Sequence, residues 1–63
     1  MMLKMDKFIG LTEAQANTLA QENGYTTRVM SRNGERFCGT ADMQMRRVNL
    51  TIENDLVTAA KVG

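Results

Sequence analysis

The chain has 63 residues, of which 43% are hydrophobic and 24% are charged, and its formal net charge is +1. A chain of this length forms one domain at most, and this composition is that of a folded protein rather than a disordered one. The balanced charge gives no reason to expect a nucleic acid or a membrane surface as partner. One cysteine and no histidine exclude an internal disulfide and a Cys/His zinc site, so we expect no metal and no cofactor.

We expect no secretory signal peptide at the start of this sequence. Its first residues, Met-Met-Leu-Lys-Met-Asp-Lys, lack the apolar stretch of a secretory signal peptide. We therefore expect a cytoplasmic protein. We also expect residues 1–63 to form a single domain in which residues 1–7 are flexible.

One helix is predicted near the start of the domain. Thr12 is a candidate N-cap, and Gln15, three residues later, completes the pattern of a capping box. Small and apolar residues then recur at helical spacing, and Gly24 suits the left-handed conformation that often ends a helix. These signals predict a helix from Glu13 to about Asn23.

Three strands are predicted after the helix, over residues 25–31, 47–53 and 56–62. The second has the clearest alternation of apolar and polar side chains, which is typical of a strand with one buried face. Asn54-Asp55 tolerates positive φ at both positions and predicts a tight type I′ turn, so the last two strands should form an antiparallel hairpin. The first two strands are separated by a long link and can be parallel neighbours. The sequence thus predicts an α+β domain with one helix on a small mixed three-stranded sheet.

The link from Arg32 to Arg46 is about as long as loops normally become in compact domains, where such loops are usually functional or disordered. We expect it to be a long exposed binding loop. Within it, Cys38 fits a small apolar plug better than a reactive thiol, because no histidine is available to activate it. Outside it, we expect Met30 to fill a gap in the core.

A short motif spans the end of this link and the start of the next strand. It reads Thr, any residue, Asp, a variable stretch and then Arg-hydrophobic-Asn, and its fixed positions are Thr40, Asp42, Arg47, Val48 and Asn49. Together with Phe8-Ile9-Gly10, the capped helix, the strand Thr27-Arg28-Val29-Met30 and the closing Lys61-Val62-Gly63, the motif resembles the potato inhibitor I family, especially its small bacterial peptidase inhibitors. The resemblance covers the chain from Phe8 to Gly63.

The resemblance implies a serine protease inhibitor, not an enzyme, whose loop is bound by the protease as a substrate would be. Carried over by position, Thr40 precedes the reactive bond, Ala41 enters the primary specificity pocket and Asp42 follows the bond. Met43 and Gln44 continue the protease-binding loop, although the family often has Tyr and Arg there. A small residue such as Ala41 favours a subtilisin-like or elastase-like target.

The resemblance also implies that Arg47 supports the loop from its base by donating hydrogen bonds into it. A planar guanidinium suits this task, because it presents several donors in a fixed arrangement and can reduce the entropy that a loop loses on binding. The simpler alternative is that Arg47 is a solvated charge at a strand start, while Thr40 and Asp42 are ordinary turn residues.

Other functions stay open. The carboxylates are scattered over separate elements and there is no Gly-rich phosphate loop, so catalysis is not expected. The alternative function is a non-inhibitory protein-interaction module on the same fold, either a monomer or a weak homodimer, because so small a core gains from burying more apolar area. Met43 and Met45 can contact a partner, although we expect one of them to tuck under the loop.

Overall fold

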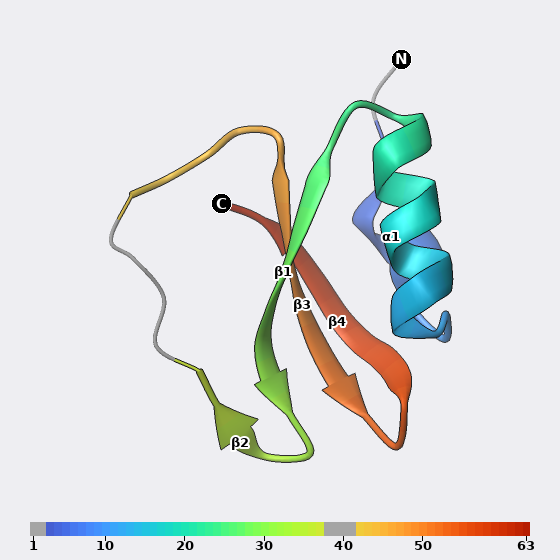
Figure 1. The fold of residues 1–63 in the computed structure, drawn as a ribbon, viewed down its shortest axis with the longest axis vertical. Helices are drawn as coiled ribbons and strands as arrows, with labels where there is room; N and C mark the ends of the chain where they lie inside the picture. The colour runs from blue at the N-terminus through green and yellow to red at the C-terminus, as the bar shows by residue number, and fades with distance from the viewer. Residues whose placement is uncertain (1–2, 38–41) are drawn as a thin grey trace.

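A computed structural model describes residues 3–37 and 42–63 of the chain. The elements are the 3-10 helix η1 (Met5–Phe8), the helix α1 (Glu13–Glu22) and the strands β1 (Thr26–Arg32), β2 (Glu35–Arg36), β3 (Arg47–Glu53) and β4 (Leu56–Val62). The strands form one mixed sheet in the order β2-β1-β3-β4. Figure 1 shows α1 and η1 together on one side of this sheet.

The helix begins and ends as its sequence predicts. The backbone N–H of Gln15 donates to the hydroxyl of Thr12 at 3.2 Å, and the backbone N–H of Thr12 donates to the side-chain oxygen of Gln15 at 3.0 Å. This reciprocal capping box satisfies two donors that would otherwise lack partners at the helix start. Gly24 follows the helix with a φ of +77°, the left-handed conformation expected of it.

The predicted strand pairings are confirmed. Strand β1 pairs with β3 in parallel, with Thr26 opposite Arg47 and Arg28 opposite Asn49. Strand β3 pairs with β4 in antiparallel orientation. The turn between them has positive φ at both Asn54-Asp55 positions, 52° and 66°, as a type I′ turn requires.

The predicted count of three strands is wrong, because the sheet has a fourth strand at its edge. Asn33 and Gly34 have φ values of 51° and 82°, and this turn folds the chain back so that β2 pairs with the end of β1. The sequence was expected to end a strand at Asn33-Gly34, without a further strand after it. Two consecutive residues that tolerate positive φ also connect strands in a tight hairpin, and here they do so.

The core lies between the sheet and the helices. Its fully buried apolar residues come from η1, α1, β3 and β4, and they are Phe8, Ala16, Ala20, Val48, Leu50, Ile52 and Val57. The three members on β3 confirm the predicted alternation of that strand. Because alternate side chains of a strand point to opposite faces, Arg47, Asn49 and Thr51 point away from α1.

Helix η1 adds a large apolar group to this small core, although no element was predicted there. Phe8 is completely buried. The following segment is fixed to the sheet, because Gly10 N–H donates to the carbonyl oxygen of Val57 at 2.8 Å and Val57 N–H donates to that of Leu11 at 2.8 Å. The flexibility of residues 1–7 stays a prediction.

Met30 does not join the buried cluster as expected. It is half-buried and lies with Asn49, Thr51 and Lys61, on the sheet face away from α1. The cause is the position of Met30 in the strand, because it alternates with Val29, which packs against the core.

Candidate functional site

The candidate site is the end of the link between β2 and β3. The structure describes Asp42 to Arg46 of this link, which Figure 1 draws in yellow to orange, away from α1 and leading into β3. Thr40, Ala41 and Cys38 lie outside the described residues. We call Asp42 to Arg46 the loop shoulder.

Arg47 joins the loop shoulder to the residue that follows β4, at the same end of the sheet. It is the first residue of β3 and only 8% exposed. Its Nη2 donates to the backbone carbonyl oxygen of Asp42 at 2.9 Å, and its Nε donates to the carbonyl oxygen of Gly63, after β4, at 2.8 Å. A further guanidinium nitrogen, Nη1, lies 3.6 Å from the carboxylate of Asp42. One buried side chain therefore holds both the backbone and the carboxylate of the same loop residue.

Asn49 continues this network along β3. Its Nδ2 donates to the carbonyl oxygen of Gly63 at 3.1 Å, so this oxygen accepts from both Asn49 and Arg47. Its Oδ1 accepts a hydrogen bond from Nε of Arg28, on β1, at 3.0 Å. Asn49 belongs to the motif that ends in Arg-hydrophobic-Asn, whereas no site role was predicted for Arg28. The signal that identifies Arg28 is the parallel register of β1 and β3, which sequence alone does not give.

Asp42 is held in its charged form. The pKa of its carboxyl group is lowered, chiefly because the side-chain amide of Gln44 donates a hydrogen bond to Oδ2 at 3.0 Å, and also because of the positive charges of Arg47 and Arg28. Desolvation acts in the opposite direction and does not outweigh these effects. The structure thus brings together three residues that the sequence singled out, Asp42, Gln44 and Arg47.

Arg46 anchors the other end of the loop shoulder. Its backbone carbonyl oxygen accepts from Thr26 N–H at 2.8 Å, and its guanidinium carbon lies 5.8 Å from the centre of the Tyr25 ring. A cation at this distance from an aromatic ring is weakly attracted to it. The backbone contact fixes the point at which the link rejoins the sheet.

Met43 and Met45 are both exposed, by 76% and 73%. The expectation that one of them tucks under the loop is therefore wrong. Met45 lies between two residues whose backbone or side chain is bonded to the sheet, and Met43 follows the anchored Asp42 directly. The loop shoulder thus presents flexible apolar side chains to the solvent from an anchored backbone.

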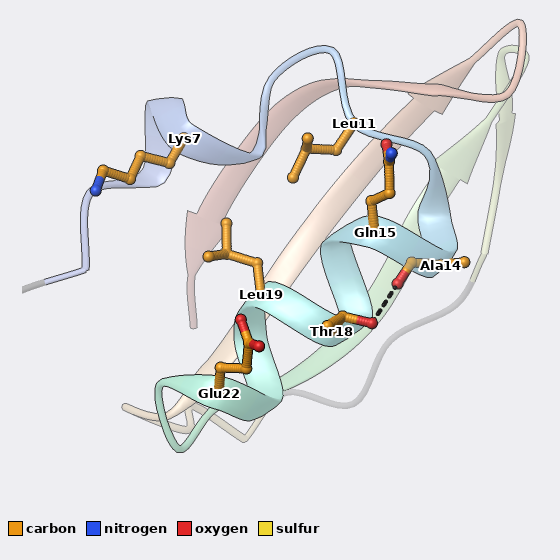
Figure 2. A pocket seen from close by; sticks show the side chains of 7 residues that line it. All are labelled: Lys7, Leu11, Ala14, Gln15, Thr18, Leu19 and Glu22. Carbon is orange, nitrogen blue, oxygen red and sulfur yellow. Dashed lines mark hydrogen bonds between the residues drawn. The ribbon is translucent and has the colours of Figure 1, made fainter.

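A separate apolar groove lies between α1 and the segment that precedes it. Figure 2 shows Leu11 and Leu19 pointing into it from its two sides, with Lys7 and Glu22 at its margin. The hydroxyl of Thr18, also in the lining, donates to the carbonyl oxygen of Ala14 at 3.1 Å. This lining suits an apolar side chain of a partner rather than a chemical reaction.

Two features are absent from the described residues, 3–37 and 42–63. Within them, no three side chains of His, Cys, Asp or Glu gather as potential metal ligands. Nor does any helix of this part of the chain have the length and apolarity needed to cross a membrane.

No protein-family model, curated protein or solved structure matches the chain. The resemblance to potato inhibitor I proteins therefore stays a prediction.

Proposed function

We propose that this protein inhibits a serine protease by presenting the link before β3 as a substrate, with the bond between Ala41 and Asp42 as its reactive bond. The observation that best supports this proposal is the contact of Arg47 with Asp42, at 2.9 Å to the carbonyl oxygen and 3.6 Å to the carboxylate. Such a contact has a clear use in a loop that must keep its shape when a protease binds.

Preorganisation is the first advantage of this contact. A flexible loop loses conformational entropy when it binds, and this loss weakens binding. Arg47 is itself bonded to Gly63 and belongs to β3, so Asp42 is attached to the sheet. Bonds from a charged donor are stronger than bonds between neutral groups. The loop shoulder therefore enters the complex with much of its order already in place.

The same contact explains how a cut loop would remain bound. The protease serine attacks the carbonyl carbon of Ala41, forms an ester with it and releases the amino group of Asp42. Because Arg47 holds Asp42 by its backbone carbonyl, the released amino group stays beside the ester. It can then attack the ester carbon, re-form the peptide bond and return the serine oxygen to the enzyme. A protease occupied in this way turns over very slowly.

The target class follows from the residues next to the reactive bond. Ala41 fits a specificity pocket that accepts small side chains, as in elastase-like and subtilisin-like enzymes. The exposed Met43 and Met45 add adaptable apolar contacts on the other side of the bond.

The test is a titration of subtilisin and of elastase with the protein, followed by residual activity and intact mass. We expect loss of activity together with a single cut between Ala41 and Asp42. Rapid digestion, or full protease activity at high micromolar concentrations of the protein, would contradict the proposal.

The apolar groove favours a second candidate function, a protein-interaction module that can form a homodimer. Its lining offers Leu11 and Leu19 to another surface. Ala14 also lines the groove and is exposed, so Ala14→Glu adds a charge there without disturbing the core, and an acidic residue in the first turn suits the helix. Sedimentation of the wild type and of Ala14→Glu tests this candidate. A dimer that is lost in the variant would support it, and a wild-type monomer at every concentration would exclude the homodimer.

A further inference from the structure

A continuous line of hydrogen bonds connects the centre of the sheet with the loop shoulder. It runs from Arg28 on β1 to Asn49 on β3, from Asn49 to Gly63 after β4, and from Gly63 through Arg47 to Asp42. Every donor to acceptor distance in it lies between 2.8 and 3.1 Å. Arg28 stands at the end of this line that is most distant from Asp42 along the bonds.

The parallel register explains why Arg28 nevertheless lies near the loop shoulder. Arg28 is opposite Asn49, and paired residues of neighbouring strands point to the same face of a sheet. Arg47, two residues before Asn49, also points to that face. Since β3 starts directly after the loop shoulder, the side chains of Arg28, Arg47 and Asn49 lie next to it on that face of the sheet. Arg28 is half-buried, so its charge is less screened by water than that of a fully exposed arginine.

Arg28 is one of the two groups that orient the amide of Asn49. An asparagine amide has an oxygen that accepts and a nitrogen that donates, and rotation by half a turn exchanges them. Nε of Arg28 can only donate, so it selects the orientation in which Oδ1 faces β1. In this orientation Nδ2 faces Gly63 and donates to its carbonyl oxygen. The opposite orientation would turn Nδ2 toward the donor of Arg28 and Oδ1 toward the acceptor oxygen of Gly63, so Arg28 and Gly63 favour the same orientation.

The oriented amide in turn helps to fix Arg47. The same backbone oxygen of Gly63 accepts from Nδ2 of Asn49 and from Nε of Arg47. This oxygen is the fixed point from which the guanidinium of Arg47 reaches Asp42. A change in the orientation of Asn49 therefore affects Gly63, and through Gly63 it affects Arg47 and the loop shoulder.

From these contacts we infer that Arg28 is a positioning residue for the loop shoulder, which it holds in place by orienting Asn49 and by adding positive charge below Asp42. The effect of Arg28 on inhibition rests on the proposed function, whereas its effect on the order of the loop does not. The competing explanation is that Arg28 and Asn49 are an ordinary cross-strand pair that stabilises only the sheet.

The test compares Arg28→Gln with Arg32→Gln. Arg32 ends the same strand and also has a polar partner, since its Nη2 lies 2.7 Å from Oε1 of Glu13, but this partner is on α1. Both variants remove an arginine of β1 that bonds a polar side chain on another element. Only Arg28→Gln removes an arginine from the network of the loop shoulder.

The first measurement is limited digestion of the folded protein by thermolysin, a metalloprotease that a serine protease inhibitor of this kind does not block. We expect Arg28→Gln to be cut within the loop shoulder about tenfold faster than the wild type, the factor that corresponds to the loss of one hydrogen bond to a charged group. Arg32→Gln should be cut there at the wild-type rate, once both rates are corrected for global unfolding measured in urea.

The second measurement is an NMR titration of the Asp42 carboxyl group. Because the charge of Arg28 helps to lower the pKa of Asp42, Arg28→Gln should raise this pKa and Arg32→Gln should leave it unchanged. A contribution of Arg28 to the stability of the sheet alone would not move it. The absence of either change in Arg28→Gln, or an equal change in Arg32→Gln, would overturn the inference.

The two measurements remain informative if the wild type inhibits no protease, because neither uses a serine protease. In that case the proposed function fails, while the role of Arg28 is still decided. If the wild type does inhibit, we expect the inhibition constant of Arg28→Gln to rise about tenfold and that of Arg32→Gln to stay at the wild-type value. An unchanged inhibition constant in Arg28→Gln would contradict a role of Arg28 in inhibition.

Discussion

Arg47 donates a hydrogen bond from Nη2 to the backbone carbonyl oxygen of Asp42 at 2.9 Å, from a position where only 8% of the residue is exposed. Burying an arginine is costly unless its donors are used. Here its Nε is also used, by the carbonyl oxygen of Gly63 at 2.8 Å. The pairing of Arg47 with Asp42 thus satisfies a buried charge and anchors the loop at the same time, and the first two predictions below depend on it.

Arg47→Lys should weaken inhibition while retaining the positive charge. A single ammonium group cannot reproduce the planar fork that reaches Gly63 and Asp42 together. The loss of one bond from a charged donor, about 1.5 to 3 kcal/mol, predicts an inhibition constant about ten to a hundred times larger. The measurement is titration of subtilisin with the variant. Arg46→Lys is the matched control, because Arg46 is exposed and its contact with the sheet is made by the backbone. Equal weakening by both variants would contradict a specific role of Arg47.

The interactions of the Asp42 carboxylate with Gln44 and Arg47 should weaken at acidic pH, whereas the bond of Arg47 to the Asp42 backbone carbonyl should not depend on pH. Because the folded state lowers the pKa of Asp42, it favours the charged carboxylate, and this contribution to stability is complete above the ordinary aspartate pKa of about 3.9. It disappears as the pH falls through the lowered pKa. Urea unfolding at a series of pH values below about 5 tests this, with Asp42→Asn as the control. The stability of the wild type should approach that of the variant as the pH falls. A constant difference between the two proteins would contradict the prediction.

Ala41→Arg should convert the protein into an inhibitor of trypsin. If Ala41 enters the specificity pocket, an arginine at this position meets the acidic residue at the base of the trypsin pocket. Met43→Arg is the matched control, since Met43 is 76% exposed in the same loop but does not occupy the pocket in the proposed mode. Trypsin activity measured with each variant decides the prediction. Inhibition by Met43→Arg but not by Ala41→Arg would show that the reactive bond is assigned to the wrong position.

Phe8→Ala should unfold much of the protein at room temperature. Removing a buried phenylalanine costs about 3 to 5 kcal/mol, and a core of this size supplies a net stability of the same order. Phe37→Ala is the matched control, because Phe37 is 41% exposed whereas Phe8 is completely buried. The control should change the free energy of unfolding by less than about 1 kcal/mol. Circular dichroism during urea titration gives both values. A cooperative wild-type transition in Phe8→Ala would mean that η1 contributes little to the core.

Local signals in the sequence predicted the elements that depend on a few neighbouring residues. The capping box of Thr12 and Gln15 formed as expected, because each side chain bonds the backbone of the other within one helical turn. The turn at Asn54-Asp55 formed because both residues tolerate positive φ. Asn33-Gly34 also tolerates positive φ at both positions, but the hairpin that it forms was not predicted. This hairpin adds β2 to the sheet.

Helix η1 and the surroundings of Met30 were not predicted, because their environment is supplied by distant segments. Met5 to Phe8 is too short for a periodic pattern, and the burial of Phe8 depends on the sheet beneath it. Met30 has a side chain suited to a core, yet its place in β1 directs it to the opposite face. Composition alone does not distinguish the two faces of a strand in which both are partly apolar.

For the candidate site, the sequence by itself determined which residues stand close together along the chain, namely Asp42, Gln44 and Arg47, because their spacing brings them to one end of a strand. Only the tertiary structure decided that Arg47 reaches Gly63 and that Arg28 orients Asn49. These contacts join three strands whose register is selected by the packing of the whole core rather than by any local pattern. The physical reason is that a hydrogen bond between strands requires both residues to be placed by the fold before either side chain can reach its partner.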